Sequence, residues 1–187
     1  MTSTQTFLLT GGRAPVTLEL ARLAHAAGMR VIVAESLALP LTRFSRAVHA
    51  HHRVPSPRMA PVAFVSALSD IVRRERVDLL IPTCEEVFHL ARHGDALRSL
   101  TQLFAAPFDA LLALHSKHRF IALVQAAGLP APHTARFTDR DALRAHVRSG
   151  EPMVLKPEFS RFATRVLVRP RPSDVDLLDV SVASPWV

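Results

Sequence analysis

Two lysines stand out among the basic residues of this sequence. Of 23 lysines and arginines, only Lys117 and Lys156 are lysine. Because arginine fills every other basic position, we interpret the two lysines as a requirement for a compact ammonium on a flexible stem, such as a point contact to phosphate. Either lysine alone could be an ordinary surface residue, so the interpretation depends on their two contexts taken together.

The local contexts of the two lysines differ. Lys117 follows Ser116 at the expected start of a helix, where the positive end of the helix dipole adds to its charge. Lys156 ends the apolar stretch MVLK and precedes Pro157, which places it at the end of an expected strand. A helix start and a strand end therefore each present an ammonium group that could contact phosphate.

Residues 1–108 alternate between strand and helix patterns. TFLLTGG and MRVIVAES are typical of buried strands, and the segment from Pro15 to Ala27 between them predicts a helix. Residues 37–61 are interpreted as mostly loop, although HHRVPSP within them could form a strand. A helix from Pro61 to Arg76, the strand VDLLIPT, the helix CEEVFHLARH and the strand SLTQLFAAP follow. This alternation predicts an α/β domain of Rossmann-like type with a mostly parallel sheet.

Residues 109–187 have a different pattern. A helical pair, DALLALHSK and HRFIALVQAAGL, is broken around His115 and Ser116. The strand PHTARF, a helix over TDRDALRAHVRSG with Thr138 or Asp139 at its N-cap, and the strands EPMVLKP and TRVLVRP are expected to follow. These elements predict a helical linker and a small α+β unit. The closing residues SPWV resemble the start of a buried strand, so we expect a larger fold that continues past Val187.

Several other features carry weaker signals. Gly11 and Gly12 follow the first strand, but the dinucleotide pattern G-x-G-x-x-G is absent, so we favour a tight turn, and Glu35 is weak evidence for a ribose contact. Cys84 has no cysteine partner and is interpreted as a structural thiol. The histidines at 49, 51 and 52 are interpreted as a solvated loop rather than a metal site.

Composition disfavours two classes of partner. The formal net charge of +7 is compatible with nucleic-acid binding, but the arginines are scattered, no tyrosine is present and no basic stripe carries stacking aromatics. No apolar stretch reaches the roughly 20 residues needed to cross a bilayer. We therefore expect a cytoplasmic protein that binds neither nucleic acid nor membrane, and homodimer formation stays open.

The order of these features resembles ATP-grasp enzymes of the carbamoyl-phosphate synthetase and biotin carboxylase type. The resemblance covers essentially the whole chain and rests on SKHRFIALVQAAGLPAPHT followed, about forty residues on, by PMVLKPEFSRFATRVLV. It implies a Rossmann-like pre-ATP-grasp domain over 1–108, then a helical linker and an incomplete small ATP-grasp subdomain over 109–187. It also implies that Lys117 and Lys156 contact the phosphates of ATP.

The segment after Lys156 departs from that family pattern. The phosphate-covering loop of biotin carboxylase relatives is glycine-rich, whereas PEFSRFAT contains no glycine. Ser160 and Arg161 could still meet phosphate, with Phe159 and Phe162 packing over the site. The alternative is a plain hairpin between two strands. The resemblance also makes Glu85, at the expected carboxyl edge of the first sheet, a weak candidate for binding the acceptor substrate.

The resemblance implies an ATP-dependent ligase that works through an acyl phosphate. Its cofactors would be ATP and Mg²⁺, and its other substrates an unidentified small-molecule carboxylate and a nucleophile such as an amine or thiol. The metal ligands and the adenine-binding hinge are expected beyond Val187, so residues 1–187 alone are expected to be inactive. The alternative is a non-catalytic α/β binding or interaction module.

Overall fold

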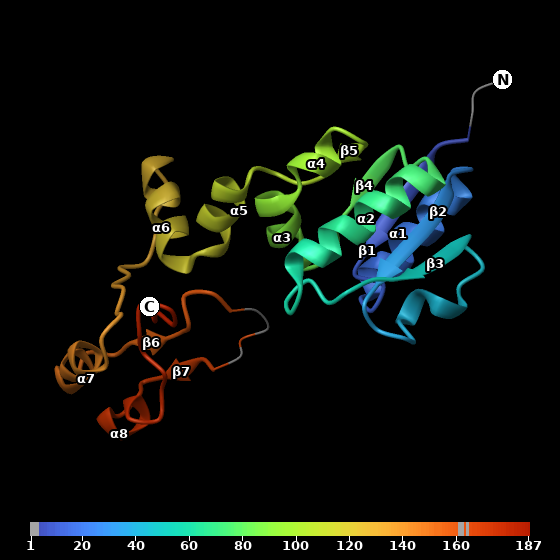
Figure 1. Ribbon diagram of the computed structural model, residues 1–187. Coiled ribbons are helices and arrows are strands. Elements are labelled where there is room, and N and C mark those ends of the chain that lie inside the picture. Colours follow the sequence, from blue (N-terminus) through green and yellow to red (C-terminus); the bar gives the residue numbers. More distant parts are fainter. Residues whose placement is uncertain (1–3, 161–162, 164) are drawn as a thin grey trace. The chain divides into compact units, whose positions relative to one another are not determined.

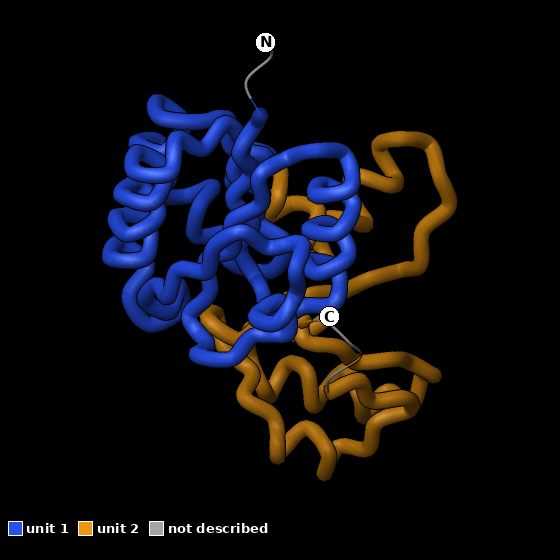
Figure 2. Tube along the Cα trace, turned by 90° about the vertical axis from the view of Figure 1, so that its right-hand side faces the viewer, with its two compact units in different colours: residues 1–108 blue, residues 109–187 orange. Residues whose placement is uncertain are grey.

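The computed structural model describes residues 4–160, 163 and 165–187 (Figure 1). The chain divides into two compact units, residues 1–108 and residues 109–187, which Figure 2 colours separately. In the described part of the chain, no helix is both long enough and apolar enough to cross a membrane. Each unit has its own core and is described in turn.

The first unit is built on a five-stranded, fully parallel sheet with the strand order β3-β2-β1-β4-β5. The strands are β1 (Thr6–Thr10), β2 (Arg30–Glu35), β3 (Ala50–Arg53), β4 (Leu79–Ile81) and β5 (Gln102–Leu103). The chain runs outward from β1 to β3, then returns to the other side of β1 for β4 and β5. The carboxyl ends of β1 and β4 therefore flank a switch point, where open α/β sheets bind ligands. The predicted α/β fold with a mostly parallel sheet is confirmed.

Helices cover both faces of this sheet, which explains why its central strands are apolar throughout. Leu8, Ile32 and Leu80 pack on one face against α2 (Pro61–Glu75), through side chains that include Phe64 and Leu68. Leu9 and Val33 pack on the other face with Ala21 and Ala24 of α1 (Pro15–Ala26). Both helices begin with a proline in the first turn. Proline is tolerated there because backbone N–H groups of the first turn have no acceptor within the helix. Helices α3 (Glu86–His93) and α4 (Asp95–Arg98) complete the unit.

Residues 37–61, predicted as mostly loop with a possible strand at HHRVPSP, contain two short regular elements. A short 3-10 helix, η1 (Leu41–Phe44), follows β2, and β3 pairs with β2 in parallel. His51 and His52 are accordingly part of a strand and not of a solvated loop, whereas His49 precedes the strand and is exposed, as predicted. His51 Nε2 lies 3.0 Å from the Thr42 carbonyl oxygen, and His52 Nε2 lies 2.9 Å from Glu75 Oε1. Because β3 is a half-buried edge strand, it needs no continuous apolar run.

The second unit begins with two helices, α5 (Phe108–His115) and α6 (Lys117–Ala126), separated at Ser116. Helix α7 (Arg140–Arg148) has Asp139 as its N-cap, because the Asp139 carboxylate accepts from the Ala142 N–H at 2.8 Å. Strands β6 (Val154–Leu155) and β7 (Leu167–Val168) form an antiparallel pair, followed by α8 (Pro172–Val175). The strand predicted over PHTARF is reduced to a single bridge between Phe137 and Trp186.

Trp186 is the largest side chain in the core of the second unit and is 1% exposed. It packs with Leu143, Leu155 and Val175, and its indole N–H donates to the Asp179 carbonyl oxygen at 2.9 Å. The backbone on either side of Trp186 pairs with the segment that follows β6. Lys156 exchanges two hydrogen bonds with Val187, of 2.8 and 2.9 Å, and the Glu158 N–H donates to the Pro185 carbonyl oxygen at 2.8 Å. The residues after β6 are therefore fixed by the closing segment of the chain.

Candidate functional site

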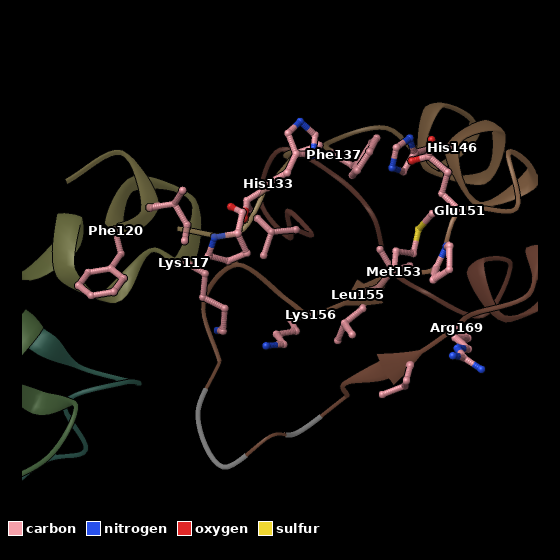
Figure 3. Close-up of a pocket in the computed structure, with 18 residues that line it drawn as sticks. Lys117, Phe120, His133, Phe137, His146, Glu151, Met153, Leu155, Lys156 and Arg169 are labelled. Carbon is pink, nitrogen blue, oxygen red and sulfur yellow. The ribbon is translucent and has the colours of Figure 1, made fainter. Parts of the chain in front are cut away.

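Lys117 and Lys156 line one open cavity in the second unit, with a volume of about 760 Å³ (Figure 3). Lys117 comes from the first turn of α6 and Lys156 from the end of β6. Figure 3 shows the two side chains extending toward the same side of the cavity. The structure thus brings together the two residues that the sequence singled out.

The start of α6 holds Lys117 in place. Ser116 is the N-cap of this helix, and its hydroxyl oxygen accepts from the Arg119 N–H at 3.1 Å. The extended backbone of Ser116 ends α5 and begins α6. The serine cap therefore explains both the break in the helical pattern and the position of Lys117 at the helix start.

The ammonium of Lys117 is already surrounded by oxygen atoms of the segment that follows Lys156. Its Nζ donates to the carbonyl oxygens of Pro157, Glu158 and Ser160 at 3.0, 3.2 and 3.1 Å, and to the Ser160 Oγ at 2.9 Å. Burial lowers the pKa of Lys117, and the nearby Lys156 ammonium lowers it further, against an opposing effect of Glu158. Ser160 therefore lies beside Lys117.

Lys156 differs from Lys117 in its partners. Its ammonium makes no hydrogen bond or ion pair with residues 4–160, 163 or 165–187. Its backbone, by contrast, is fixed through the paired hydrogen bonds to Val187. Lys156 consequently offers an ammonium on an anchored stem, available to a ligand in the cavity.

Glu158 connects the two parts of the chain that carry the lysines. The residue is 2% exposed, and its carboxylate accepts hydrogen bonds from the Ser116 Oγ and from Arg136 Nε, the latter at 2.6 Å. Burial acts to raise the pKa of Glu158, but the hydrogen bonds from Ser116 and Arg136 outweigh it and the pKa is lowered. Sequence reasoning missed this role, although an acidic residue two positions after Lys156 could have been noticed as a counter-charge.

One wall of the cavity is apolar. Val154 and Val168 are directly paired across β6 and β7, and both are exposed, at 45% and 70%. Ile121 and Val187 also line the cavity. An exposed pair of β-branched side chains beside an ammonium suits a ligand that has an apolar face and an anionic end.

The remaining predicted residues of this site have mixed outcomes. Phe159 is partly exposed, and its ring centroid lies 5.8 Å from that of His115, so it packs beside the break between α5 and α6. Arg161 and Phe162 lie outside the described residues. Their predicted contacts with phosphate and with the site therefore stay predictions.

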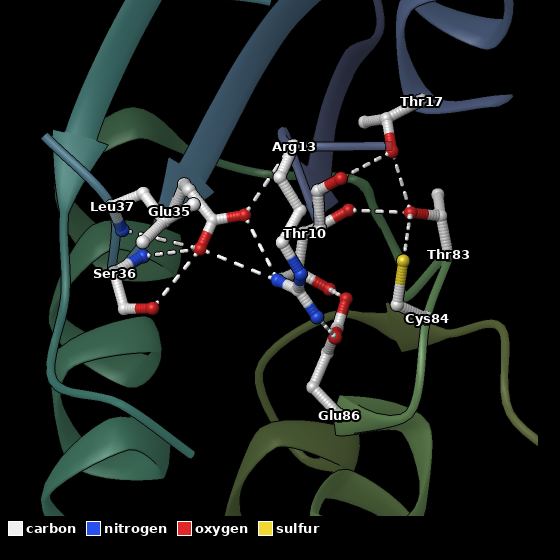
Figure 4. A network of polar contacts seen from close by, with 10 residues as sticks. Thr10, Arg13, Thr17, Glu35, Ser36, Leu37, Thr83, Cys84 and Glu86 are labelled. Atoms are coloured by element: carbon white, nitrogen blue, oxygen red, sulfur yellow. Dashed lines mark hydrogen bonds and ion pairs between the residues drawn. The ribbon is translucent and has the colours of Figure 1, made fainter. Parts of the chain in front are cut away.

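A second polar cluster occupies the carboxyl edge of the first sheet (Figure 4). Arg13 lies between two buried carboxylates, with Nη1 3.0 Å from Glu35 Oε2 and Nη2 3.3 Å from Glu86 Oε2. Thr10 Oγ1 donates to Glu86 Oε1 at 2.8 Å. Burial acts to raise the pKa of Glu35, and backbone hydrogen bonds together with the Arg13 charge lower it overall. The cluster ties the ends of β1, β2 and α3 together.

The glycine turn after β1 belongs to this cluster. Gly11 has φ +73°, and a Cβ placed there would lie 2.5 Å from Thr83 Oγ1 and 2.7 Å from Glu86 Oε1. The Thr17 hydroxyl donates to the Gly11 carbonyl oxygen at 2.6 Å. The structure therefore agrees with a tight turn, and gives the close approach of Thr83 and Glu86, which follow β4, as the reason for glycine.

The acidic residues and the cysteine around this polar cluster differ in their burial and in their partners. Glu86 is buried in the cluster, whereas Glu85 precedes α3 and is exposed at the same edge, where its proposed contact with a substrate stays a prediction. Glu35 is occupied by Arg13, Ser36 and Leu37. Cys84 is half-buried, and burial raises the pKa of its thiol, as a structural cysteine would show.

Within the described ranges, no three His, Cys, Asp or Glu side chains gather in a way that could hold a metal ion. Glu158, the buried carboxylate closest in sequence to the lysines, is already paired with Ser116 and Arg136. No magnesium ligand set is therefore assigned among the residues that the structure describes.

Comparison with solved structures identifies the fold. The L-amino acid ligase from Bacillus licheniformis matches 100% of this chain with a TM-score of 0.73 and 17% identity. N5-carboxyaminoimidazole ribonucleotide synthetase, solved as an ADP complex, matches 92% with a TM-score of 0.66 and 17% identity. The biotin carboxylase of Campylobacter jejuni, solved as a β-γ-ATP complex, matches 90% with a TM-score of 0.67 and 15% identity.

All three are ATP-grasp enzymes, and the chain has the fold of their N-terminal part. It spans 44%, 42% and 39% of the lengths of these three proteins. No family model matches the sequence, and a comparison with curated proteins gives no match. At such low identities the likeness establishes the fold.

Proposed function

We propose that this chain is the N-terminal portion of an ATP-dependent ligase of ATP-grasp type, and that its second unit binds the phosphates of ATP through Lys117 and Lys156. The observation that carries the proposal is that the two lysines of the sequence line one cavity of about 760 Å³. Cofactor sites commonly have volumes of roughly 300–1,000 Å³. The solved complexes of similar proteins with ADP and with β-γ-ATP support a nucleotide as the ligand.

The two sides of the cavity suit the two ends of a nucleotide. The exposed pair Val154 and Val168 offers an apolar surface for a base. Lys156 offers an ammonium that lacks a partner among the described residues, and an ammonium is a point contact for phosphate. This arrangement favours ATP over an inorganic anion, because an inorganic anion has no apolar surface to bury against Val154 and Val168.

Lys117 and Ser160 would act at the phosphate end as well. Lys117 now donates to three carbonyl oxygens and to the Ser160 hydroxyl. A phosphate oxygen carries more negative charge than a carbonyl oxygen, so it would compete for the same ammonium. We infer that Lys117 divides its donors between phosphate and the segment 157–160, with Ser160 and Arg161 contributing further contacts.

The reaction proposed for the whole protein is ligation through an acyl phosphate. ATP supplies the γ-phosphoryl group: a substrate carboxylate oxygen attacks phosphorus, the bond to ADP breaks, and an acyl phosphate forms. An amine or another nucleophile then attacks the acyl carbon and releases phosphate. The residues of this chain contribute positioning and charge neutralisation, which are the main needs of phosphoryl transfer.

Magnesium accompanies ADP in one of the similar structures, a 2-oxoglutarate carboxylase domain solved with MgADP. Because the described residues form no metal cluster, we assign no metal ligand to this chain. Any magnesium would be brought by the nucleotide or held elsewhere in the whole protein. The acceptor substrate is not identified, and Glu85 stays a prediction for its binding.

The test is a calorimetric titration of the protein with Mg·ATP at low salt. Wild type, Lys156→Ala and Lys156→Arg are compared, with Arg148→Ala as the matched control, because Arg148 is an exposed cation of the same unit that does not line the cavity. We expect Lys156→Ala to weaken binding roughly tenfold or more, since a charge-assisted hydrogen bond contributes about 1.5–3 kcal/mol. Arg148→Ala should bind like wild type.

Separate titrations with tripolyphosphate and with adenosine distinguish binding of the phosphates from binding of the base. Binding of tripolyphosphate should depend on Lys156, and binding of adenosine should not. The alternative function, a non-catalytic interaction module, predicts no Lys156-dependent nucleotide binding by any of these proteins. That outcome would leave the ATP-grasp likeness as a matter of fold only.

A further inference from the structure

A second cavity lies in the first unit, at the carboxyl ends of β2 and β3. Its volume is about 250 Å³. Its lining comes from β2, the loop after it, η1 and β3, and comprises Glu35, Leu37, Ala38, Pro40, Arg43, His51, His52 and Arg53. This is the edge of the sheet at which open α/β folds place ligands.

The charges around this cavity are predominantly positive. Arg43 on η1 and Arg53 on β3 are exposed, and neither side chain makes a hydrogen bond or ion pair within the described part of the chain. The acidic lining residue, Glu35, is already neutralised by Arg13 and accepts further hydrogen bonds from Ser36 and Leu37. No described carboxylate therefore balances the two guanidinium groups.

His51 adds a neutral polar group to the lining. Its Nε2 lies 3.0 Å from the Thr42 carbonyl oxygen, so Nε2 carries the hydrogen and donates to it. Burial lowers the pKa of His51, and the charge of Arg43 lowers it further, which keeps the ring neutral at pH 7. The other ring nitrogen, Nδ1, is consequently an acceptor. A ligand that carries a hydroxyl beside its anionic group could satisfy it.

We propose that this cavity binds the phosphate group of a small phosphate monoester through Arg43 and Arg53. Two guanidinium groups from separate elements match the charge of a phosphate monoester, which is about −1.5 to −2 at pH 7. A single carboxylate would be satisfied by one bidentate arginine. Leu37, Ala38 and Pro40 provide a short apolar wall for the carbon skeleton. This site lies wholly in the first unit and is independent of the proposed ATP site.

The test measures binding of inorganic phosphate and of malonate by calorimetry at low ionic strength. All proteins carry Lys156→Ala, which weakens phosphate binding at the proposed ATP site, so that the dependence on Arg43 and Arg53 reports the cavity of the first unit. Arg43→Ala and Arg53→Ala are compared with Arg46→Ala, an exposed arginine of the same loop that does not line the cavity. We expect phosphate to bind the Lys156→Ala protein, and each cavity variant to weaken that binding at least tenfold while Arg46→Ala leaves it unchanged.

Three results would overturn the proposal. The first is no phosphate binding, and the second is an equal loss in all three arginine variants, which would indicate attraction to the overall positive charge. The third is tighter binding of malonate than of phosphate with the same dependence on Arg43 and Arg53, which would assign the cavity to a dicarboxylate. Because both cavity arginines are exposed, loss of folding is not expected, and circular dichroism of each variant verifies this.

Discussion

Ser116 and Glu158 are joined by a buried hydrogen bond between two segments that lie about forty residues apart in the sequence. Ser116 also caps α6, so the same hydroxyl accepts from the helix and donates to the carboxylate. Each lysine of the proposed ATP site is a near neighbour of one of these residues. The contact therefore holds the start of α6 against the segment that follows β6, the two places from which the lysines extend.

The first prediction concerns this contact. Ser116→Ala and Glu158→Gln should each lower the free energy of unfolding of the second unit by about 1–3 kcal/mol, because each leaves a buried polar partner poorly satisfied. The double variant should lose less than the sum, since the two residues share one interaction. The fluorescence of Trp186, the one tryptophan of the sequence, reports unfolding of this unit. Glu151→Gln, an exposed glutamate of the same unit, is the control, and strict additivity would contradict the prediction.

The second prediction concerns pH. The pKa of Glu158 lies below its ordinary value of 4.5, because hydrogen bonds from Ser116 and Arg136 outweigh the effect of burial. Its stabilising effect is then complete above pH 4.5 and is lost as the pH falls through the lowered pKa. Wild type should therefore lose stability on acidification more steeply than Glu158→Gln. Denaturant unfolding followed by Trp186 fluorescence between pH 7 and pH 3 measures the free energy of unfolding of both proteins. If that free energy falls equally with pH in wild type and Glu158→Gln, the prediction is wrong.

The third prediction separates the two lysines. Lys156→Ala should weaken ATP binding without changing the melting temperature, since its ammonium has no partner in the described ranges. Lys117→Ala should weaken binding and also lower the melting temperature, because its Nζ holds three carbonyl oxygens and the Ser160 hydroxyl. Calorimetry of ATP binding and thermal melting of both variants test whether only Lys117→Ala affects stability. Equal melting temperatures for the two variants would show that the carbonyl contacts do not stabilise the unit.

The sequence predicted the parallel sheet because its central strands, such as Val31–Val33, are apolar on both faces and alternate with helices. It also predicted a break between two helices around His115 and Ser116, and the structure separates α5 and α6 there. The edge strand β3 was predicted only as a possible strand, because half-buried strands at an edge tolerate His51 and His52 in place of apolar residues. The local sequence pattern gives only a weak signal for such a strand, since the strand depends on pairing with β2.

The site was less predictable than the fold. The rarity of lysine pointed to Lys117 and Lys156, but the link through Glu158 depends on a contact between distant segments, which no local pattern records. The same holds for Arg13, whose two carboxylate partners come from β2 and α3. Buried charge networks of this kind require the fold before they can be identified.

The last prediction compares two glycines that share a left-handed backbone. Gly11 and Gly28 have φ values of +73° and +83°, so alanine at either position costs about 1–2 kcal/mol for the backbone alone. A Cβ at Gly28 meets nothing within 4 Å, whereas one at Gly11 lies 2.5 Å from Thr83 Oγ1. That hydroxyl donates to the Thr10 carbonyl oxygen at 2.8 Å, so Gly11→Ala also displaces a bond between β1 and the segment after β4.

We therefore expect Gly11→Ala to destabilise the first unit by about 2–4 kcal/mol, and Gly28→Ala by only the backbone cost. Far-ultraviolet circular dichroism follows unfolding of the whole chain, while Trp186 fluorescence follows the second unit by itself. The two signals should separate in Gly11→Ala, with the dichroism transition moving to lower denaturant and the fluorescence transition staying in place. Equal losses for the two alanine variants would mean that the approach of Thr83 to the turn does not require glycine at position 11.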